Sequence, residues 1–528
     1  MKLKKRWWVW TTAGLLAFLA IVGIAAWRLS RELEPYIKAK TIEYLRAKFD
    51  SDVEIGSLGV RVPWRTMWTS RRLEDVRASG SGIAVRYRGR RDIPPLLALK
   101  RFEFRVDVQT IWAGDPKVRN VRLEGLEINM PPKGERPARA ASKVSPPPPS
   151  EPPAAKVYID EIIADGAKLT MLPKDPAREP LQFDMQKLKL EAAGVGVPMK
   201  YITTLMNAKP PGLIQSLGTF GPWNTEAPGE TPVDGKYRFE KADLGVFKGI
   251  DGILESEGAF TGPLNELIVD GWANVPDFRL HNVGQAVPLK TRFHAFVDGT
   301  NGNTLLEPVD ATLGDTSFTA KGGVVRNKDE IGKTVDLAVV LQRGNIQDLL
   351  RLAVKGAKPF LRGGVSLNMK LTLPPGKKEV ADRLQLAGSF NLINAHFTSP
   401  DIKDKISDLS QRSLGQPDEA PTAEVATNLA GSFNLRDGVI RFSRLAFTIP
   451  GARVDLDGQY VFGSEELDFH GTSRTEARLS EMMKTRWKRW ALKPIDPVFA
   501  KEGYGTVMQI AITGTRSNPS FGLDHKKK

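Results

Sequence analysis

Segments in which apolar and polar residues strictly alternate occur throughout most of this sequence. Residues 102–108, 367–373 and 508–512 are clear examples. A period of two is that of a β-strand with one face buried and the other in water. Such one-sided strands are typical of antiparallel sheets. The 48 glycines and 37 prolines favour short strands and turns over long helices. The sequence therefore predicts a mainly β protein whose strands share one apolar face.

An uncharged apolar segment near the N-terminus, Trp7 to Trp27, predicts a membrane anchor. Its 21 residues would form a helix of roughly 31 Å, the thickness of a bilayer core. The basic residues ahead of it should stay in the cytoplasm, so the chain would cross once and place its bulk outside. A cleaved signal peptide is the alternative, but the apolar segment exceeds the roughly 7–15 residues of a signal core. Its ends carry the aromatic residues expected at headgroup depth, namely Trp7, Trp8, Trp10 and Trp27.

The net charge of +15 is concentrated near this anchor, since residues 1–150 carry 29 Lys and Arg against 15 Asp and Glu. A basic region beside an anchor most simply contacts anionic lipid headgroups. A solvated surface is an equally simple interpretation, whereas nucleic-acid binding conflicts with the predicted topology. The candidate headgroup contacts are Arg61, Arg65, Arg71, Arg72, Arg86, Arg88, Arg90 and Arg91.

Composition divides the chain into four parts. Residues 1–28 form the cytoplasmic tail and anchor, and residues 29–130 a helix followed by a basic β region. Residues 131–155 include nine prolines and predict a solvated connector. This connector either links two sheets or forms a long loop leaving one sheet. Residues 156–528 form the β-rich body.

Within this body, three stretches predict helices: one from Ile346, one from about Pro400 to Gly415, and one over residues 476–492. In the third, Leu479, Met482, Met483, Trp487 and Trp490 would form one stripe opposite basic residues. That pattern is typical of a helix lying on a bilayer, although a helix capping a sheet would also bury such a stripe. The residues of this candidate interfacial helix are Trp487, Trp490, Lys484 and Lys488.

A heptapeptide, Leu-Ala-Gly-Ser-Phe-Asn-Leu, occurs at residues 386–392 and again at residues 429–435. Seven identical residues indicate a repeated strand unit. Repeated strand units are typical of solenoid-like assemblies in which each unit packs on its neighbours.

Residues that carry chemistry are scarce. The chain has no cysteine, and its five histidines show no metal-ligand spacing. No phosphate-binding loop or nucleophile motif occurs. We therefore expect a protein that is not an enzyme and has no cofactor and no catalytic or metal site. An envelope enzyme would instead require carboxylates or histidines clustered in a cleft.

Several motifs resemble the bacterial AsmA-like family. They are residues 207–214 (NAKPPGLI), 220–223 (FGPW), 231–235 (TPVDG), 242–250 (ADLGVFKGI), 297–302 (VDGTNG) and the ending over 512–523. The resemblance implies an inner-membrane anchor in a diderm bacterium and a periplasmic body. It also implies likeness to bridge-like lipid transfer proteins, in which a curled, elongated antiparallel sheet forms an apolar groove. This chain is shorter than the largest relatives.

Together, the residues and the resemblance predict an elongated, repetitive antiparallel β-groove with a few short helices and one N-terminal transmembrane helix. The expected partners are phospholipid acyl chains, the inner membrane and other envelope proteins, and not nucleic acid. The expected function is phospholipid transport to the outer membrane or its homeostasis. The rival hypothesis is a periplasmic scaffold for envelope assembly, which would bury its apolar strand faces in a closed sandwich.

Overall fold

The computed structural model describes most of the chain from residue 51 to residue 524. The described residues are 35, 38–39, 42, 51–61, 76–87, 91, 94–107, 117–130, 158–172, 180–193, 198–222, 228–247, 249–281, 284–326, 332–354, 359–376, 378–419, 425–500, 503–515 and 518–524. Within these residues, 23 of the 25 strands belong to one large, mostly antiparallel sheet that does not close on itself. This confirms the predicted mainly β class. The chain divides into two compact units, residues 1–238 with 261–264 and residues 239–260 with 265–528.

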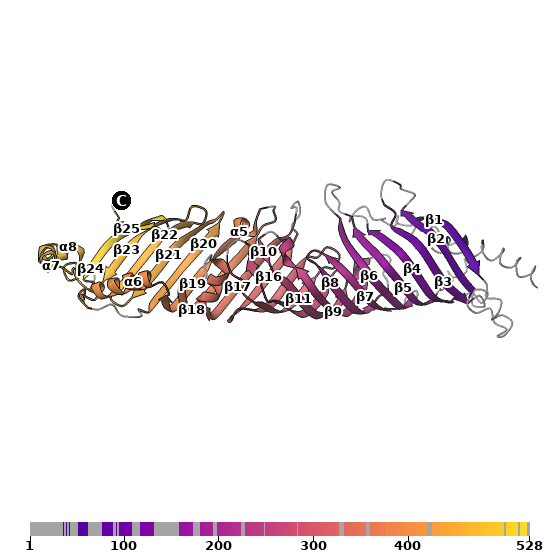
Figure 1. The fold of residues 1–528 in the computed structure, drawn as a ribbon, viewed down its shortest axis with the longest axis horizontal. Helices are drawn as coiled ribbons and strands as arrows, with labels where there is room; N and C mark the ends of the chain where they lie inside the picture. The colour runs from indigo at the N-terminus through magenta and orange to yellow at the C-terminus, as the bar shows by residue number, and fades with distance from the viewer. Residues whose placement is uncertain are drawn as a thin grey trace, which may run out of the picture. The chain divides into compact units, whose positions relative to one another are not determined.

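In the first unit, β1 to β8 lie side by side in chain order (Figure 1), each hydrogen-bonded to the next. The strands are β1 (Ser51–Arg61), β2 (Val76–Tyr87), β3 (Leu97–Asp107), β4 (Lys117–Met130), β5 (Tyr158–Met171), β6 (Leu181–Ala193), β7 (Met199–Ala208) and β8 (Pro211–Phe220). The short helix η1 (Pro228–Glu230) precedes β9 (Pro232–Asp243), whose first seven residues belong to this unit.

The pairing of β4 with β5 explains the proline-rich segment. These two strands run parallel, with Lys117 opposite Tyr158 and Met130 opposite Met171. Parallel neighbours require a crossover of a dozen or more residues, whereas antiparallel neighbours need only a tight turn. β4 and β5 are therefore parallel neighbours in one sheet, and the proline-rich residues 131–155 lie outside the described residues.

Strands β1 to β6 share a bend at one level of the sheet. At this level Gly82 lies opposite Lys100, which in turn lies opposite Gly125, and none of these positions forms a ladder pair. Gly82, Gly125 and Gly166 have φ angles of 71°, 62° and 65°, a left-handed conformation that glycine adopts at little cost. A residue in this conformation interrupts the alternation of the strand, so the side chains that follow it change face.

The bend shifts the phase of the apolar pattern. Apolar residues or glycine occupy positions i, i+2, i+5 and i+7 of each strand, so both halves of the strand turn their apolar side chains to the same face. These positions are 53, 55, 58 and 60 in β1; 78, 80, 83 and 85 in β2; 97, 99, 102 and 104 in β3; 121, 123, 126 and 128 in β4; 162, 164, 167 and 169 in β5; and 183, 185, 188 and 190 in β6.

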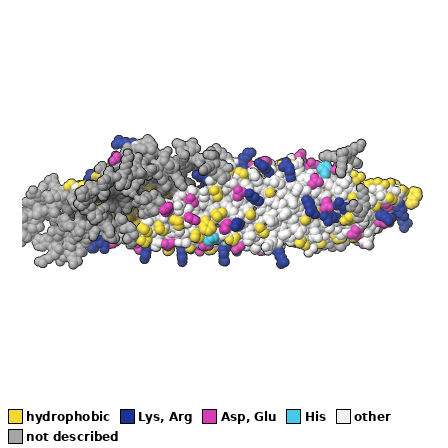
Figure 2. Space-filling view, turned by 180° about the vertical axis from the view of Figure 1, so that it is seen from behind, with side chains coloured by type: hydrophobic (Ala, Val, Ile, Leu, Met, Phe, Trp, Pro, Cys, Tyr) yellow, Lys and Arg dark blue, Asp and Glu magenta, His cyan; other side chains and the backbone are white. Residues whose placement is uncertain are grey.

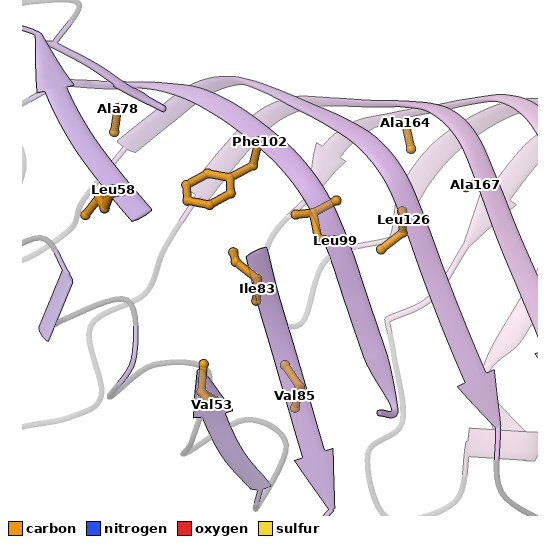
Figure 3. Packing of buried hydrophobic residues seen from close by; sticks show 10 residues of the cluster. All are labelled: Val53, Leu58, Ala78, Ile83, Val85, Leu99, Phe102, Leu126, Ala164 and Ala167. Atoms are coloured by element: carbon orange, nitrogen blue, oxygen red, sulfur yellow. The ribbon is translucent and has the colours of Figure 1, made fainter. Parts of the chain in front are cut away.

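A packed hydrophobic core lies inside this bend. Figure 3 shows its side chains pointing into a common interior from both halves of the strands, with Leu58, Phe102 and Ile83 approaching one another. Ile42, at a helical position ahead of β1, packs against the same cluster. The buried members are Val53, Leu58, Ala78, Ile83, Val85, Leu99, Phe102, Leu126, Ala164 and Ala167.

The second unit continues the same antiparallel pattern, and from β14 onward each strand of its large sheet pairs with the next (Figure 1). Its strands are β10 (Ile250–Asp251), β11 (Ile253–Pro263), β12 (Leu267–Val275), β13 (Arg279–Leu280), β14 (Leu289–Val297), β15 (Thr304–Leu313), β16 (Thr316–Val325), β17 (Thr334–Asn345), β18 (Leu361–Leu373), β19 (Gln385–Phe397), β20 (Thr427–Arg436), β21 (Val439–Ile449), β22 (Ala452–Val461), β23 (Glu466–Thr475), β24 (Thr506–Thr515) and β25 (Asn518–Leu523). Its helices are η2 (Leu244–Val246), α4 (Ile346–Ala353), α5 (Val380–Arg383), α6 (Pro400–Ser413), α7 (Arg486–Leu492), η3 (Lys493–Ile495) and α8 (Asp496–Phe499).

Two of the three predicted helices are confirmed as α4 and α6. The third begins at Arg486 rather than near residue 476. The residues ahead of it form turns because Met482 is buried and Ser480 donates hydrogen bonds from its amide and hydroxyl to the Asp496 carboxylate. The predicted continuous stripe is therefore wrong, since its methionines precede the helix.

The two copies of the heptapeptide lie next to each other as β19 and β20. They pair antiparallel about Ser389 and Ser432, so Leu386 faces Leu435 and Phe390 faces Gly431. The repeat is thus a local two-fold arrangement of neighbouring strands and not successive turns of a solenoid.

No helix within the described residues is both long enough and apolar enough to cross a bilayer. The predicted anchor, with Trp7, Trp8, Trp10 and Trp27, lies outside those residues, as does the proline-rich segment 131–155.

Candidate functional site

The second unit carries a row of apolar residues and glycines that crosses twelve strands at right angles to the strand direction. We call it lane 1. Its residues are register partners from one strand to the next, each is apolar or glycine, and none is exposed. In order from β12 to β24 they are Gly271, Phe293, Val309, Ala320, Val339, Met369, Gly388, Phe433, Phe442, Gly458, Phe469 and Ile512.

Two further lanes flank lane 1 on the same face, about 7 Å to either side, because side chains on one face recur every second residue. Lane 2 comprises Leu341, Leu367, Phe390, Gly431, Leu445, Leu456, Gly471 and Ile510. Lane 3 comprises Val269, Ala295, Leu306, Gly322, Leu337, Leu371, Leu386, Leu435, Ile440, Tyr460, Leu467 and Gly514. Across all three lanes, the Tyr460 hydroxyl is the only polar side-chain group.

On β19, β20 and β23, a phenylalanine in one of lanes 1 and 2 lies beside a glycine in the other. A Cβ atom on Gly431 would lie 2.9 Å from Cε1 of Phe390, so the ring of Phe390 covers this glycine. The ring centroids of Phe390 and Phe442 are 6.3 Å apart, and those of Phe442 and Phe469 are 5.9 Å apart. Aromatic rings thus form a continuous patch over glycine backbone, which makes this part of the face smooth as well as apolar.

The two faces of the sheet differ sharply in exposure. Val339 in lane 1 is 7% exposed, whereas its neighbour Val340, which points to the opposite face, is 38% exposed. Trp272 and Leu305 also lie on that opposite face and are exposed. On β17 the lane face is therefore much less exposed to water than the opposite face.

Helix α4 bounds the lane face beside β18. Its Ile346, Leu349 and Leu350 pack against the cluster that contains Leu341 of lane 2. The helix is held by the buried carboxylate of Asp348, which accepts a hydrogen bond from the Thr316 hydroxyl at 2.8 Å and one from a backbone amide at 3.2 Å.

The opposite face holds a shallow depression of about 870 Å³ across β12 to β17. Trp272, Lys290, Arg292 and Arg343 are among its lining residues, together with the carboxylate of Asp310. It is open, its lining includes both charged and apolar side chains, and it is separated from the lanes by the sheet itself.

Titratable groups with shifted pKa values lie away from the lanes. A hydrogen bond with His281 lowers the pKa of Asp251, burial raises the pKa of Tyr201, and burial lowers the pKa of Lys333. Within the described parts of the chain, no group of three or more histidines and carboxylates could hold a metal ion.

The structure describes three of the eight predicted headgroup arginines. Arg61 is exposed, while Arg86 and Arg91 each lie 3.8 Å from the carboxylate of Glu54. Two of the three thus have an acidic neighbour. The other five, Arg65, Arg71, Arg72, Arg88 and Arg90, lie outside the described residues.

The residues of the predicted interfacial helix separate into two groups. Trp487 and Trp490 are highly exposed on α7, with the Lys488 ammonium 5.7 Å from the centre of the Trp487 ring. Lys484 precedes the helix and pairs with Asp408 of α6 at 2.8 Å. The sequence did not reveal the lanes, because they depend on which apolar positions of different strands are in register.

Comparisons with known proteins gave no match: no family model, no curated protein and no solved structure is similar to this chain.

Proposed function

We propose that this protein is a single-pass inner-membrane protein whose periplasmic body binds phospholipid acyl chains along the three apolar lanes. In this role it contributes to lipid transport to the outer membrane or to its homeostasis. The single observation that carries the proposal is lane 1, an uninterrupted apolar row across twelve strands. The apolar segment from Trp7 to Trp27 and the AsmA-like motifs support the location.

The burial of lane residues supports a curled sheet. Val454, Leu456 and Phe469 are buried in a cluster whose members all come from strands β21 to β24, with no helix among them. A flat sheet with an uncovered face would leave such side chains as exposed as those on its other face. Strands that curve around their own apolar face would shield them, and the result is a groove with an apolar floor.

Such a groove suits acyl chains energetically. Strands lie about 4.8 Å apart, so a lane across twelve strands is roughly 50 Å long. Each CH₂ group moved from water onto an apolar surface contributes about 0.8 kcal/mol, irrespective of which apolar residue it touches. The floor therefore retains acyl chains without a specific site, and a lipid could move along it without breaking a strong contact.

The rival hypothesis of a non-transporting scaffold draws support from the first unit. There the apolar face between β1 and β5 is filled by its own core, against which Ile42 also packs. A protein packed in this way throughout would have no room for lipid. The carrier proposal thus depends on the second unit, and its test belongs there.

The test is photo-crosslinking in living cells with a benzophenone amino acid in place of Phe442 in lane 1 of the full-length chain. We expect a covalent adduct with radiolabelled phospholipid. The matched control carries the same probe at Leu305, which is exposed on the opposite face. Substituting Phe469→Asp beside the probe should abolish the adduct at position 442. Absence of lipid from the adducts at position 442, or equal lipid labelling at position 305, would contradict the carrier and favour the scaffold.

A further inference from the structure

The C-terminal helices form a surface of a different character, which we call the tip and define as residues 484–500. It comprises α7, η3 and α8, which lie together beyond β24 (Figure 1). Trp487, Trp490 and Val498 are 66%, 80% and 71% exposed, and Ile495 is also exposed. Figure 2 shows hydrophobic and basic side chains gathered at this end of the second unit.

This exposure does not come from a loosely attached helix, because the tip is fixed at three points. The buried Asp496 carboxylate accepts hydrogen bonds from the amide and hydroxyl of Ser480 at 2.9 and 2.6 Å. Lys484 pairs with Asp408 at 2.8 Å, and the Arg489 guanidinium pairs with Asp418 at 3.0 Å. The fold thus holds two tryptophan rings in water although burying them would be favourable.

The tip is also strongly basic. It contains five cations, Lys484, Arg486, Lys488, Arg489 and Lys493, and one carboxylate, Asp496. That carboxylate is buried and bonded internally. Arg486, Lys488 and Lys493 form no ion pair within the part of the chain that the structure describes. The outer surface of the tip therefore presents positive charge beside exposed aromatic and aliphatic side chains.

We propose that the tip docks on the headgroup region of an anionic lipid bilayer. Tryptophan rings partition to the depth of the headgroups, and basic side chains around them attract anionic lipids, which is the pattern of interfacial helices. An acidic protein surface would match the positive charge of the tip, but it would not match the two exposed tryptophans and the exposed valine. The proposal rests on the proposed function only for its location in the cell envelope, and it adds a membrane contact separate from the predicted anchor.

The absence of cysteine allows a direct test. Full-length protein, inserted into nanodiscs of neutral phosphatidylcholine, carries Val498→Cys labelled with the environment-sensitive fluorophore NBD. Vesicles of phosphatidylcholine with 30 mol% phosphatidylglycerol are then added. We expect a blue shift and at least a threefold rise in emission, reduced by 0.5 M salt. Vesicles of phosphatidylcholine alone should give a much smaller response.

Variants identify the residues responsible. Trp487→Ser with Trp490→Ser should lower the apparent vesicle affinity at least tenfold, and Arg486→Glu with Lys488→Glu should remove the preference for anionic vesicles. Trp272→Ser, an exposed tryptophan on the sheet, is the matched control and should change neither. The proposal would be overturned if the protein did not respond to anionic vesicles or responded equally to neutral ones. It would also be overturned if the tryptophan variant responded like the unmodified protein or had a lowered melting temperature. Lipid crosslinking at position 442 is measured independently, so failure of the tip and failure of the groove can be told apart.

Discussion

Val339 and Val340 offer the sharpest test of the idea that one face of the sheet is apolar and the other is wet. They are adjacent in β17 and identical in type, yet 7% and 38% exposed. Val339 packs in a cluster with Val309 and Ala320, whereas Val340 lines the open depression on the opposite face. Replacing either by threonine keeps the shape and exchanges one methyl group for a hydroxyl, so the two variants differ only in the surroundings of that hydroxyl.

At position 339 the hydroxyl would enter a cluster whose described members are all apolar. Burying a hydroxyl without a partner lowers the free energy of unfolding by about 1–3 kcal/mol. At position 340 water can solvate the hydroxyl, and a change on an exposed surface is usually within about 0.5 kcal/mol. We therefore expect Val339→Thr to be destabilising and Val340→Thr to be nearly neutral.

Hydrogen exchange of β17 amides is the appropriate assay, because a chain of two units need not unfold in a single transition. Mass spectrometry of peptides covering residues 334–345 would report the free energy of local opening in each variant. Equal loss of protection in both variants, or a larger loss in Val340→Thr, would refute the assignment of faces. The assignment of the three lanes to one apolar face would then be wrong.

Three other outcomes follow from particular contacts. Asp348→Ala removes the acceptor of the Thr316 hydroxyl and should lower protection of α4 amides by about 1–3 kcal/mol, as measured by hydrogen exchange; unchanged protection would argue against the buried bond. Shortening the segment 131–157 to about 18 residues should preserve the β4–β5 pairing. A strand of 14 residues requires a return path of roughly 45 Å, and about 14 extended residues can span that distance. Shortening it to about 8 should abolish protease resistance of both strands, and survival of that resistance would contradict the crossover. Burial opposes ionisation of Asp408, but hydrogen bonds, the first from Lys484, outweigh it and lower its pKa. A depressed pKa stabilises the fold above the unfolded-state value of about 3.9 and ceases to do so as the pH falls through the folded-state value. Denaturation at several pH values should show the stability difference from Asp408→Asn disappearing in acid, and a difference independent of pH would refute the pairing.

The sequence predicted individual strands well where alternation was unbroken. Residues 367–373 alternate and lie within β18. It was less informative in β1, where Val53, Ile55, Leu58 and Val60 fit no single period of two because the alternation shifts by one residue at the bend. The phase shift itself, repeated in six strands, was a signal visible in the sequence. A search for apolar residues or glycine at positions i, i+2, i+5 and i+7 would have found it.

The lanes are a property of register, and register is where local pattern loses its predictive power. Ser443 and Arg444 form a bulge in β21, so Phe442 and Leu445, three residues apart, lie in neighbouring lanes. When the pairing partners are unknown, such a bulge looks in the sequence like the end of a strand. The identical heptapeptides show the same limit, since identity revealed a relation between the two segments but not that they pair with each other.

A surface that binds acyl chains by area alone leaves no motif, because any apolar residue contributes about as much as another of equal size. If the proposed function is correct, it requires an apolar row and not particular members, and Gly388 and Phe433 are neighbours in lane 1. Conservative exchange within a lane should have little effect, whereas one charge placed anywhere along it interrupts the whole path. The proposed function is therefore tested by comparing two variants, one with a charge on the lane face of a strand and one with the same charge on the opposite face. Substitution of a catalytic residue is not the appropriate test.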